Sequence, residues 1–150
     1  MKLLCDHMLG TLAKWLRFMG YDTAYPGPLD DTELLLLAGR EGRVLLTRDK
    51  ELASRSSGAI RVRSDGLEEQ IREVASALRL RIVDPLSRCS VCNAVLVPAR
   101  KEDVSDRVPE GVRARHDTFW QCPSCGRVYW QGSHWDKMVE RLNHLAVDSP

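Results

Sequence analysis

A short apolar strand and an amphipathic helix open the chain, in the stretch Lys2-Leu3-Leu4-Cys5-Asp6-His7-Met8-Leu9-Gly10-Thr11-Leu12-Ala13-Lys14-Trp15-Leu16-Arg17-Phe18-Met19-Gly20. Residues 2–5 are typical of a buried strand, and apolar residues then recur at helical spacing from Leu9 to Met19. Gly20 is of a residue type that commonly ends a helix. The stretch therefore predicts a strand and a helix joined at Asp6, a carboxylate that directly follows a buried strand.

The alternation of strand and helix continues as far as residue 78. Further strands are predicted at residues 21–25, 44–46 and 59–62, and residues 82–86 form a linker or a last short strand. Helices are predicted at residues 31–41, 50–54 and 67–78, the last capped by Ser64 or Asp65. This spacing indicates an α/β fold with a parallel sheet flanked by helices. Because parallel crossovers are right-handed, all strands end at one edge, where ligands of open α/β sheets bind.

Two Cys-x-x-Cys pairs mark the second half of the chain, Cys89-Ser-Val-Cys92 and Cys122-Pro-Ser-Cys125. Four thiolates in two such pairs suit a single tetrahedral Zn²⁺. A closed Cys₄ site has no open coordination position, so it predicts a small structural zinc ribbon rather than an active centre. We expect the ribbon at residues 89–129 with a mobile, charged insertion at 101–115, then a helix at 134–145 and a tail at 146–150. The predicted domains are residues 1–86 and residues 87–150.

The composition and net charge of the chain limit the kinds of protein that it can be. Charged residues make up 29% of the chain and the formal net charge is only +1, so contact with nucleic acid must come from a local patch. Asp6 interrupts the first apolar run, unlike a signal peptide, and the apolar residues 34–38 are too short to span a bilayer. Four paired cysteines and a fifth, Cys5, fit a reducing compartment, so we expect a cytoplasmic protein with no membrane partner.

Carboxylates gather at the predicted edge of the sheet. Asp6 follows the first strand, Asp49 follows the third, and Asp30-Asp31 opens the second helix. A divalent cation relieves the repulsion between such groups, and hard carboxylate oxygens suit Mg²⁺ or Mn²⁺. A site of this kind can activate a water for attack on a phosphate. Four residues would offer hydrogen bonds or positive charge to phosphate oxygens: Lys14, Arg17, Thr47 and Arg48.

Each carboxylate also has a purely structural interpretation. Asp6, Asp31 and Asp49 could each cap the helix that follows, and Asp65 suits a cap better than a ligand. Lys14 and Arg17 could equally form a solvated helix face. The sequence spacing leaves a metal site and simple capping both open. A receiver-like phosphoacceptor domain is a less favoured interpretation, because such a domain needs an adjacent acidic pair after the first strand, and this sequence has no such pair there.

Several motifs resemble one known family. They are residues 6–23, Asp31-Thr32-Glu33-Leu34, Gly42-Arg43-Val44-Leu45-Leu46-Thr47-Arg48-Asp49, Glu69-Gln70 and residues 122–135. Together they resemble the Mut-seven C-terminal RNase domain family, a branch of the PIN-like nucleases, over residues 2–145. The resemblance implies a PIN-like α/β fold with a fused zinc ribbon and a metal-dependent ribonuclease activity. It carries over Asp6, Asp31 and Asp49 as acidic metal ligands, with Asp30 as an alternative to Asp31 and Asp65 as the nearest candidate for a fourth acidic position.

Two functions therefore compete. The leading one is a Mg²⁺- or Mn²⁺-dependent ribonuclease acting on single-stranded RNA, with its crevice in residues 1–86 and a ribbon that helps to grip the substrate. The alternative is a binding module for RNA or protein without catalysis, built on the ribbon and its basic residues Arg107, Arg113, Arg115 and Arg127. Aromatic residues of the ribbon would stack on unpaired bases or form its core: Trp120, Tyr129, Trp130 and Trp135. A homo-oligomer is compatible with the sequence, although no exposed apolar stripe requires one.

Overall fold

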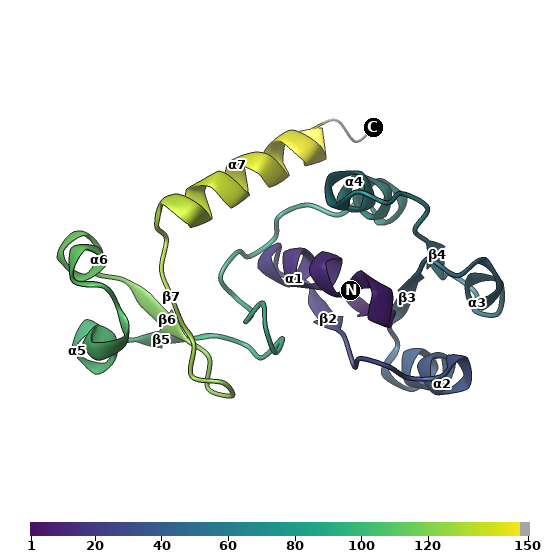
Figure 1. Ribbon diagram of the computed structural model, residues 1–150, viewed down its shortest axis with the longest axis horizontal. Coiled ribbons are helices and arrows are strands. Elements are labelled where there is room, and N and C mark those ends of the chain that lie inside the picture. Colours follow the sequence, from purple (N-terminus) through teal and green to yellow (C-terminus); the bar gives the residue numbers. More distant parts are fainter. Residues whose placement is uncertain (148–150) are drawn as a thin grey trace.

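A four-stranded parallel sheet forms the centre of the first half of the chain. The computed structural model describes residues 1–147, so the last three positions of the predicted tail lie outside the described residues. The strands are β1 (Lys2–Cys5), β2 (Asp22–Ala24), β3 (Val44–Thr47) and β4 (Ile60–Arg61), in the order β2-β1-β3-β4. The helices of this half of the chain are η1 (His7–Leu9), α1 (Gly10–Phe18), α2 (Asp31–Glu41), α3 (Lys50–Ser54) and α4 (Leu67–Leu78). The predicted α/β fold with a parallel, helix-flanked sheet is confirmed (Figure 1).

Alternation along the strands places an apolar core on each face of the sheet. In β1, Leu3 and Cys5 join the core shared with α1 and α4, whereas Leu4 joins the core shared with α2 and α3. In β3, Leu46 and Leu45 divide between the two faces in the same way. A strand that is buried on both faces reads as a continuous apolar run, which explains the sequences Leu3-Leu4-Cys5 and Val44-Leu45-Leu46.

The second half of the chain is an antiparallel ribbon. Its strands are β5 (Val97–Ala99), β6 (Phe119–Gln121) and β7 (Val128–Tyr129). The segment expected to be mobile instead forms α5 (Lys101–Val104), η2 (Ser105–Arg107) and α6 (Glu110–Arg115). Charge alone did not predict these helices, in which Val104 and the following Val108 are buried against Phe119 in a small core of their own.

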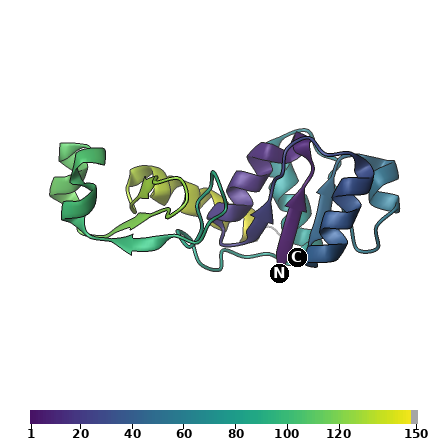
Figure 2. The same cartoon turned by 90° about the horizontal axis from the view of Figure 1, so that it is seen from below.

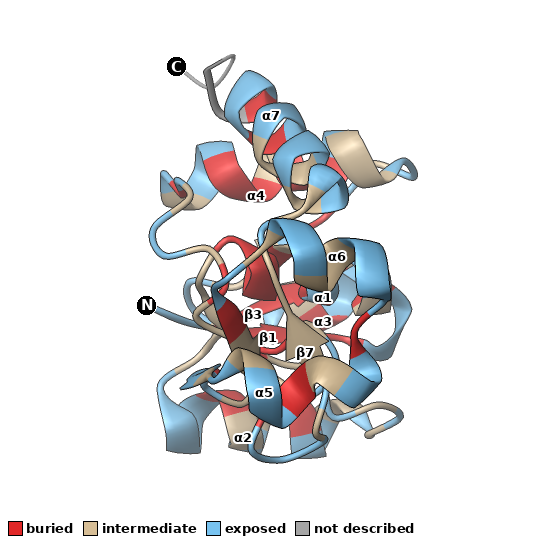
Figure 3. Ribbon diagram, turned by 90° about the vertical axis from the view of Figure 1, so that its left-hand side faces the viewer, coloured by how far each residue is buried: buried red, intermediate tan, exposed pale blue. Residues whose placement is uncertain are grey.

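The last helix, α7 (Ser133–Val147), leaves the ribbon and packs on the first half of the chain. Leu142 and Leu145 are buried in the core that α1 and α4 share. Figure 3 colours the buried parts of α4 and α7 red. Arg141 adds an ion pair to Glu68 and lies over the ring of Trp15, 5.1 Å from its centroid. The C-terminal helix therefore shares a core with residues 1–86. Among the described residues, no helix has both the length and the apolar character needed to cross a bilayer.

One predicted cap was wrong. Helix α4 is capped by Gly66, without a side-chain hydrogen bond, rather than by Ser64 or Asp65. Ser64 instead donates through both its backbone N–H and its hydroxyl to Glu73, one turn and a half into the helix. The carboxylate of Glu73 therefore holds the loop that leads into α4.

Two cysteine knuckles, residues 89–93 and residues 122–126, have the same backbone. In each, the N–H of the fifth residue donates to the carbonyl of the first cysteine, at 2.9 Å for Asn93 and at 2.9 Å for Gly126. The fifth residue has a positive φ in both knuckles, 68° for Asn93 and 83° for Gly126. Glycine and asparagine are the residues that accept this conformation most readily. The first knuckle therefore carries the side chain of Asn93 at the position where the second knuckle has a glycine.

That side chain docks the first knuckle onto β2, the edge strand of the sheet. The Asn93 amide accepts from the Thr23 N–H at 3.0 Å and donates to Asp22 Oδ1 at 2.7 Å. An edge strand exposes unpaired backbone groups, and here the ribbon covers them. Figures 1 and 2 show the ribbon on the β2 side of the sheet. We call this set of contacts, together with those of Arg17 below, the knuckle junction.

Arg17 completes the knuckle junction from α1. Its side chain is 5% exposed, and its guanidinium donates to three backbone carbonyls, those of Thr23, Ser90 and Val91, at 2.8 to 3.0 Å. Asp22 adds a negative charge to the junction. Burial raises the pKa of its carboxyl group, but hydrogen bonds from Asn93 and Arg43 outweigh this effect, so the pKa is lowered. A buried guanidinium and an ionised carboxylate thus hold the two halves of the chain together.

The knuckle junction predicts a specific loss of stability. Asn93→Gly removes both amide hydrogen bonds while keeping the positive φ, so we expect the free energy of unfolding to fall by about 1–3 kcal/mol. Asn93→Ala adds backbone strain and should cost about 1 kcal/mol more. Chemical denaturation of the zinc-loaded protein measures both values. An Asn93→Gly variant as stable as the parent would show that the junction contributes nothing to folding.

Candidate functional site

A chain of hydrogen bonds joins the carboxylate of Asp6 to the backbone of Asp49 at the carboxyl edge of the sheet. Asp6 follows β1, and Thr47 ends the neighbouring strand β3. The Thr47 hydroxyl donates to Asp6 Oδ2 at 2.9 Å and accepts from the Asp49 N–H at 3.0 Å. Thr47 is fully buried and Asp6 is 7% exposed, whereas Asp49 is exposed. Thr47 therefore ties the sheltered carboxylate of Asp6 to the backbone of Asp49, whose own carboxylate is exposed.

Both carboxylates also have structural partners. Asp6 Oδ1 accepts from the His7 N–H at 2.6 Å and contacts the His7 ring Nδ1 at 2.9 Å. Asp49 caps α3, accepting from the N–H groups of Glu51 and Leu52. Tyr25 holds the start of η1 by donating to the His7 carbonyl at 2.6 Å. The capping interpretation is thus satisfied at both positions, and it leaves the remaining lone pairs of Asp49 open to solvent.

Asp31 does not join this pair. Asp30, not Asp31, caps α2, in a reciprocal capping box with Glu33. The Asp31 carboxylate lies 3.7 Å from Arg55, which follows the end of α3 opposite to Asp49. Throughout residues 1–147, the only group of three or more candidate ligand atoms within 4.8 Å of one another consists of cysteines. The three predicted aspartates therefore do not converge as a single ligand set in this arrangement.

The predicted phosphate-binding residues divide into three kinds. Lys14 is exposed, one turn into α1. Arg48 is half-buried and pairs with Asp65, a carboxylate whose side chain is 93% exposed. Arg17 is buried in the knuckle junction, with its donors spent on backbone carbonyls. Arg17 therefore has no place in the substrate contacts proposed below, and Asp65 belongs to the surface rather than to the carboxylate pair.

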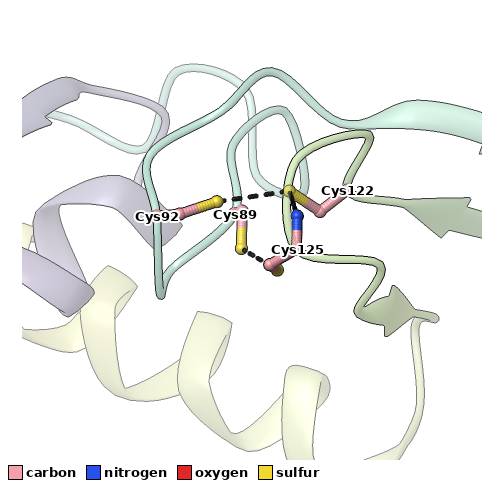
Figure 4. Close-up of side chains that lie close together, drawn as sticks. All are labelled: Cys89, Cys92, Cys122 and Cys125. Carbon is pink, nitrogen blue, oxygen red and sulfur yellow. Dashed lines mark hydrogen bonds between the residues drawn. The ribbon is translucent and has the colours of Figure 1, made fainter.

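The four cysteines of the knuckles do converge (Figure 4). Their sulfurs all lie within 4.8 Å of one another, with Cys92 and Cys122 at 3.3 Å and Cys89 and Cys125 at 3.7 Å. A tetrahedral ion with Zn–S bonds of about 2.3 Å would hold its sulfurs roughly 3.8 Å apart. The donor set and its spacing therefore fit Zn²⁺, with all four positions filled by protein.

Local hydrogen bonds favour the thiolate form of one cysteine in each knuckle, Cys89 and Cys122. In their partners, Cys92 and Cys125, a backbone hydrogen bond lowers the pKa of the thiol, but burial and the neighbouring thiols outweigh it, so the pKa is raised. Burial raises the pKa of the Cys122 thiol, but the N–H groups of Cys125 and Ser124 and the neighbouring thiols outweigh burial and lower it to about 6. The Tyr129 hydroxyl lies 3.1 Å from the Cys89 sulfur, where it can donate to a thiolate. Cys5, in contrast, is a fully buried residue of β1, and burial raises the pKa of its thiol to about 12. Cys5 is therefore an inert core residue.

Comparison with known proteins agrees with this arrangement. The family model described as the Mut7-C RNAse domain matches residues 1–142, across both the sheet and the ribbon. The chain belongs to the Mut7-C RNAse domain family. Neither a search of the curated proteins nor a search of the solved structures found a match. Membership of the Mut7-C family indicates a nuclease-like function with RNA as the substrate class.

Two features of this Mut7-C chain escaped the sequence analysis. Arg17 and Asn93 join the halves of the chain, but each looks like a surface residue in its local sequence. Asn93 carried a usable signal, because it occupies the position that glycine takes in the second knuckle. Arg17 carried a weaker one, since it is flanked by Leu16 and Phe18 and all three are buried.

Thr47 provides a test of the carboxylate pair. Thr47→Val keeps the shape of the buried side chain but removes the donor to Asp6 and the acceptor of the Asp49 N–H. We expect the free energy of unfolding to fall by about 1–3 kcal/mol in a denaturant titration. Thr11→Val, at an exposed position of α1, serves as the matched control and should change stability far less. Equal effects of the two substitutions would contradict the proposed role of Thr47.

Tyr129 provides a test of the cysteine cluster. Tyr129→Phe removes the hydroxyl beside Cys89 and should weaken zinc binding by about tenfold, as loss of a hydrogen bond to a metal ligand commonly does. Competition with a chromophoric chelator measures the affinity. Tyr25→Phe, whose hydroxyl contacts His7 instead, should leave the zinc affinity unchanged. An unchanged zinc affinity in the Tyr129→Phe variant would show that the Tyr129 hydroxyl does not support the thiolate.

Proposed function

We propose that this protein is a metal-dependent ribonuclease that hydrolyses phosphodiester bonds of single-stranded RNA at the carboxyl edge of its sheet. The observation that carries the proposal is the Asp6–Thr47–Asp49 chain of hydrogen bonds on adjacent parallel strands of a Mut7-C RNAse domain. Such an edge is where open α/β sheets bind their ligands. The family supports a ribonuclease, and the carboxylates support the dependence on metal.

The donor chemistry of the edge fits a hard divalent cation. Carboxylate oxygens are the ligands that Mg²⁺ and Mn²⁺ prefer, and Asp6 and Asp49 would hold the ion. Asp31 would complete the ligand set or orient the attacking water, which requires it to leave Arg55. When bound, the ion supplies water activation and neutralises charge on the phosphate.

The protein residues supply position and charge around that centre. Thr47 holds the Asp6 carboxylate by donating to one oxygen, and the His7 N–H holds the other. Asp49 is exposed at the start of α3, where it can meet a substrate without a change of fold. Lys14 and Arg48 would neutralise flanking phosphates, Arg48 by exchanging Asp65 for a phosphate oxygen.

The four-cysteine centre has a separate, structural function. Four protein ligands fill the shell of a tetrahedral Zn²⁺, so no position is left for a water or a substrate atom. We therefore assign Zn²⁺ to folding of the ribbon and Mg²⁺ or Mn²⁺ to hydrolysis. The use of cysteines as metal ligands also supports a cytoplasmic, reducing location.

The alternative function, binding of RNA or protein without catalysis, also has an observation in its favour. Asp6, Asp31 and Asp49 each have a structural partner, and they do not converge as three ligands. In that case the carboxylates serve folding alone. Binding would then survive neutralisation of Asp6 and Asp49.

Cleavage of labelled single-stranded RNA by the zinc-loaded protein distinguishes the two functions. We expect cleavage with added Mn²⁺ or Mg²⁺ and none without either. Asp6→Asn and Asp49→Asn should each lower the rate by at least about a hundredfold. Asparagine caps a helix as well as aspartate does, so Asp49→Asn should leave the fold intact.

The control is Asp117→Asn, at a 96% exposed carboxylate of the ribbon, which should cleave at the parental rate. Loss of zinc must be excluded by measuring the metal content of each variant. Absence of cleavage under every condition, with RNA binding retained by both site variants, would replace the ribonuclease with the binding module.

A further inference from the structure

An aromatic cleft lies between the ribbon and the sheet domain, apart from the carboxylate edge. Its volume is about 480 Å³. Its lining includes Phe18 of α1, Tyr129 and Trp130 at the end of the ribbon, and Trp135 and Met138 of α7. The segment before the first knuckle and α6 also contribute, through Leu86 and Val112. Both halves of the molecule thus contribute to one cavity, and its largest side chains are aromatic.

The two indoles of the cleft are held by different cores. Trp130 packs edge-on against Phe119 of the ribbon, with ring centroids 6.3 Å apart. Trp135 packs edge-on against Phe18 of the sheet domain, with centroids 6.5 Å apart. Both tryptophans are half-buried, so each keeps part of its ring exposed. Rigid aromatic faces of this kind are suited to stacking on a planar ligand.

Within residues 1–147, no aspartate or glutamate lines the cleft, and one guanidinium does, that of Arg88. Arg88 also pairs with Asp22 at 3.8 Å, behind the wall, and the His134 ring adds a hydrogen-bonding group. Two further cavities do include carboxylates, Glu102 and Glu110 in one and Asp84 in the other. Helix α7 begins at Ser133 in the wall, so its N–H groups add partial positive charge. An aromatic cleft with positive walls complements a planar base that carries a phosphate.

We propose that the aromatic cleft binds an unpaired base of the RNA substrate, stacked against Trp130 and Trp135. The choice of RNA rests on the proposed function, whereas the choice of an unpaired base rests on the shape and charge of the cleft. A paired base has both faces covered by its neighbours, so it cannot enter between the indoles. The cleft would thus select single-stranded RNA and anchor it at a distance from the carboxylates.

The test is a binding measurement that does not depend on cleavage. Fluorescence anisotropy of a short labelled oligoribonucleotide is followed on titration with the zinc-loaded full chain, without added Mg²⁺ or Mn²⁺. We expect the single strand to bind about tenfold more tightly than an abasic strand of the same length, because stacking on a base is lost. The duplex should bind as weakly as the abasic strand.

Variants locate the binding to the cleft. Trp130→Phe keeps the contact with Phe119 and should lower the affinity for the single strand by about fivefold. Trp120→Phe is the matched control, because Trp120 packs against the cysteine cluster and does not line the cleft. His134→Ala, at an exposed position, should weaken binding without affecting the fold.

The outcomes separate this inference from the ribonuclease itself. Equal affinity for the abasic and the normal strand, or equal effects of Trp130→Phe and Trp120→Phe, would overturn the base-binding cleft even in an active nuclease. Cleft-dependent binding in a protein that never cleaves RNA would support the cleft and contradict the nuclease. Binding of an apolar peptide that RNA cannot displace would assign the cleft to a protein partner and overturn the inference.

Discussion

Convergence of four sulfurs on one point is the constraint on which the arrangement of the whole chain depends. It fixes the first knuckle, and the first knuckle presents Asn93 and two backbone carbonyls to the edge of the sheet. Arg17 and Asp22 meet these groups from the other side and carry the charge of the junction. The ribbon then returns α7 to the core of the sheet domain. The polar knuckle junction and the apolar packing of α7 therefore join the two halves of the chain.

This arrangement divides the chemistry between two kinds of ligand. In the proposed function, soft thiolates would fill the shell of a structural Zn²⁺, whereas hard carboxylates at the open edge of the sheet would hold the catalytic cation. Thr47 links the two caps at this edge, because its hydroxyl contacts both Asp6 and the backbone of Asp49. The aromatic cleft lies apart from the carboxylate edge and shares Tyr129 with the surroundings of the cysteine cluster.

The sequence predicted the parts of this molecule whose causes are local. Alternating apolar segments predicted the strands and helices of the sheet domain, and cysteine spacing predicted the metal ligands. It failed where a residue acts through a distant segment. Arg17 looks like a surface cation until the ribbon covers it, and the pairing of Asp31 with Arg55 depends on how α2 meets α3. The helices of the insertion were missed because its buried valines contact Phe119, a residue that lies outside the insertion in sequence.

The most direct test of the central claim is to locate the catalytic cation by paramagnetic broadening. Mn²⁺ is titrated into zinc-loaded, isotope-labelled protein, and the amide signals are followed by NMR. The account predicts that signals of His7, Arg48 and Asp49 broaden first, while those of the cysteine knuckles and of Asp117 remain sharp. Uniform broadening over exposed carboxylates, with no preference for the Asp6–Thr47–Asp49 edge, would contradict it.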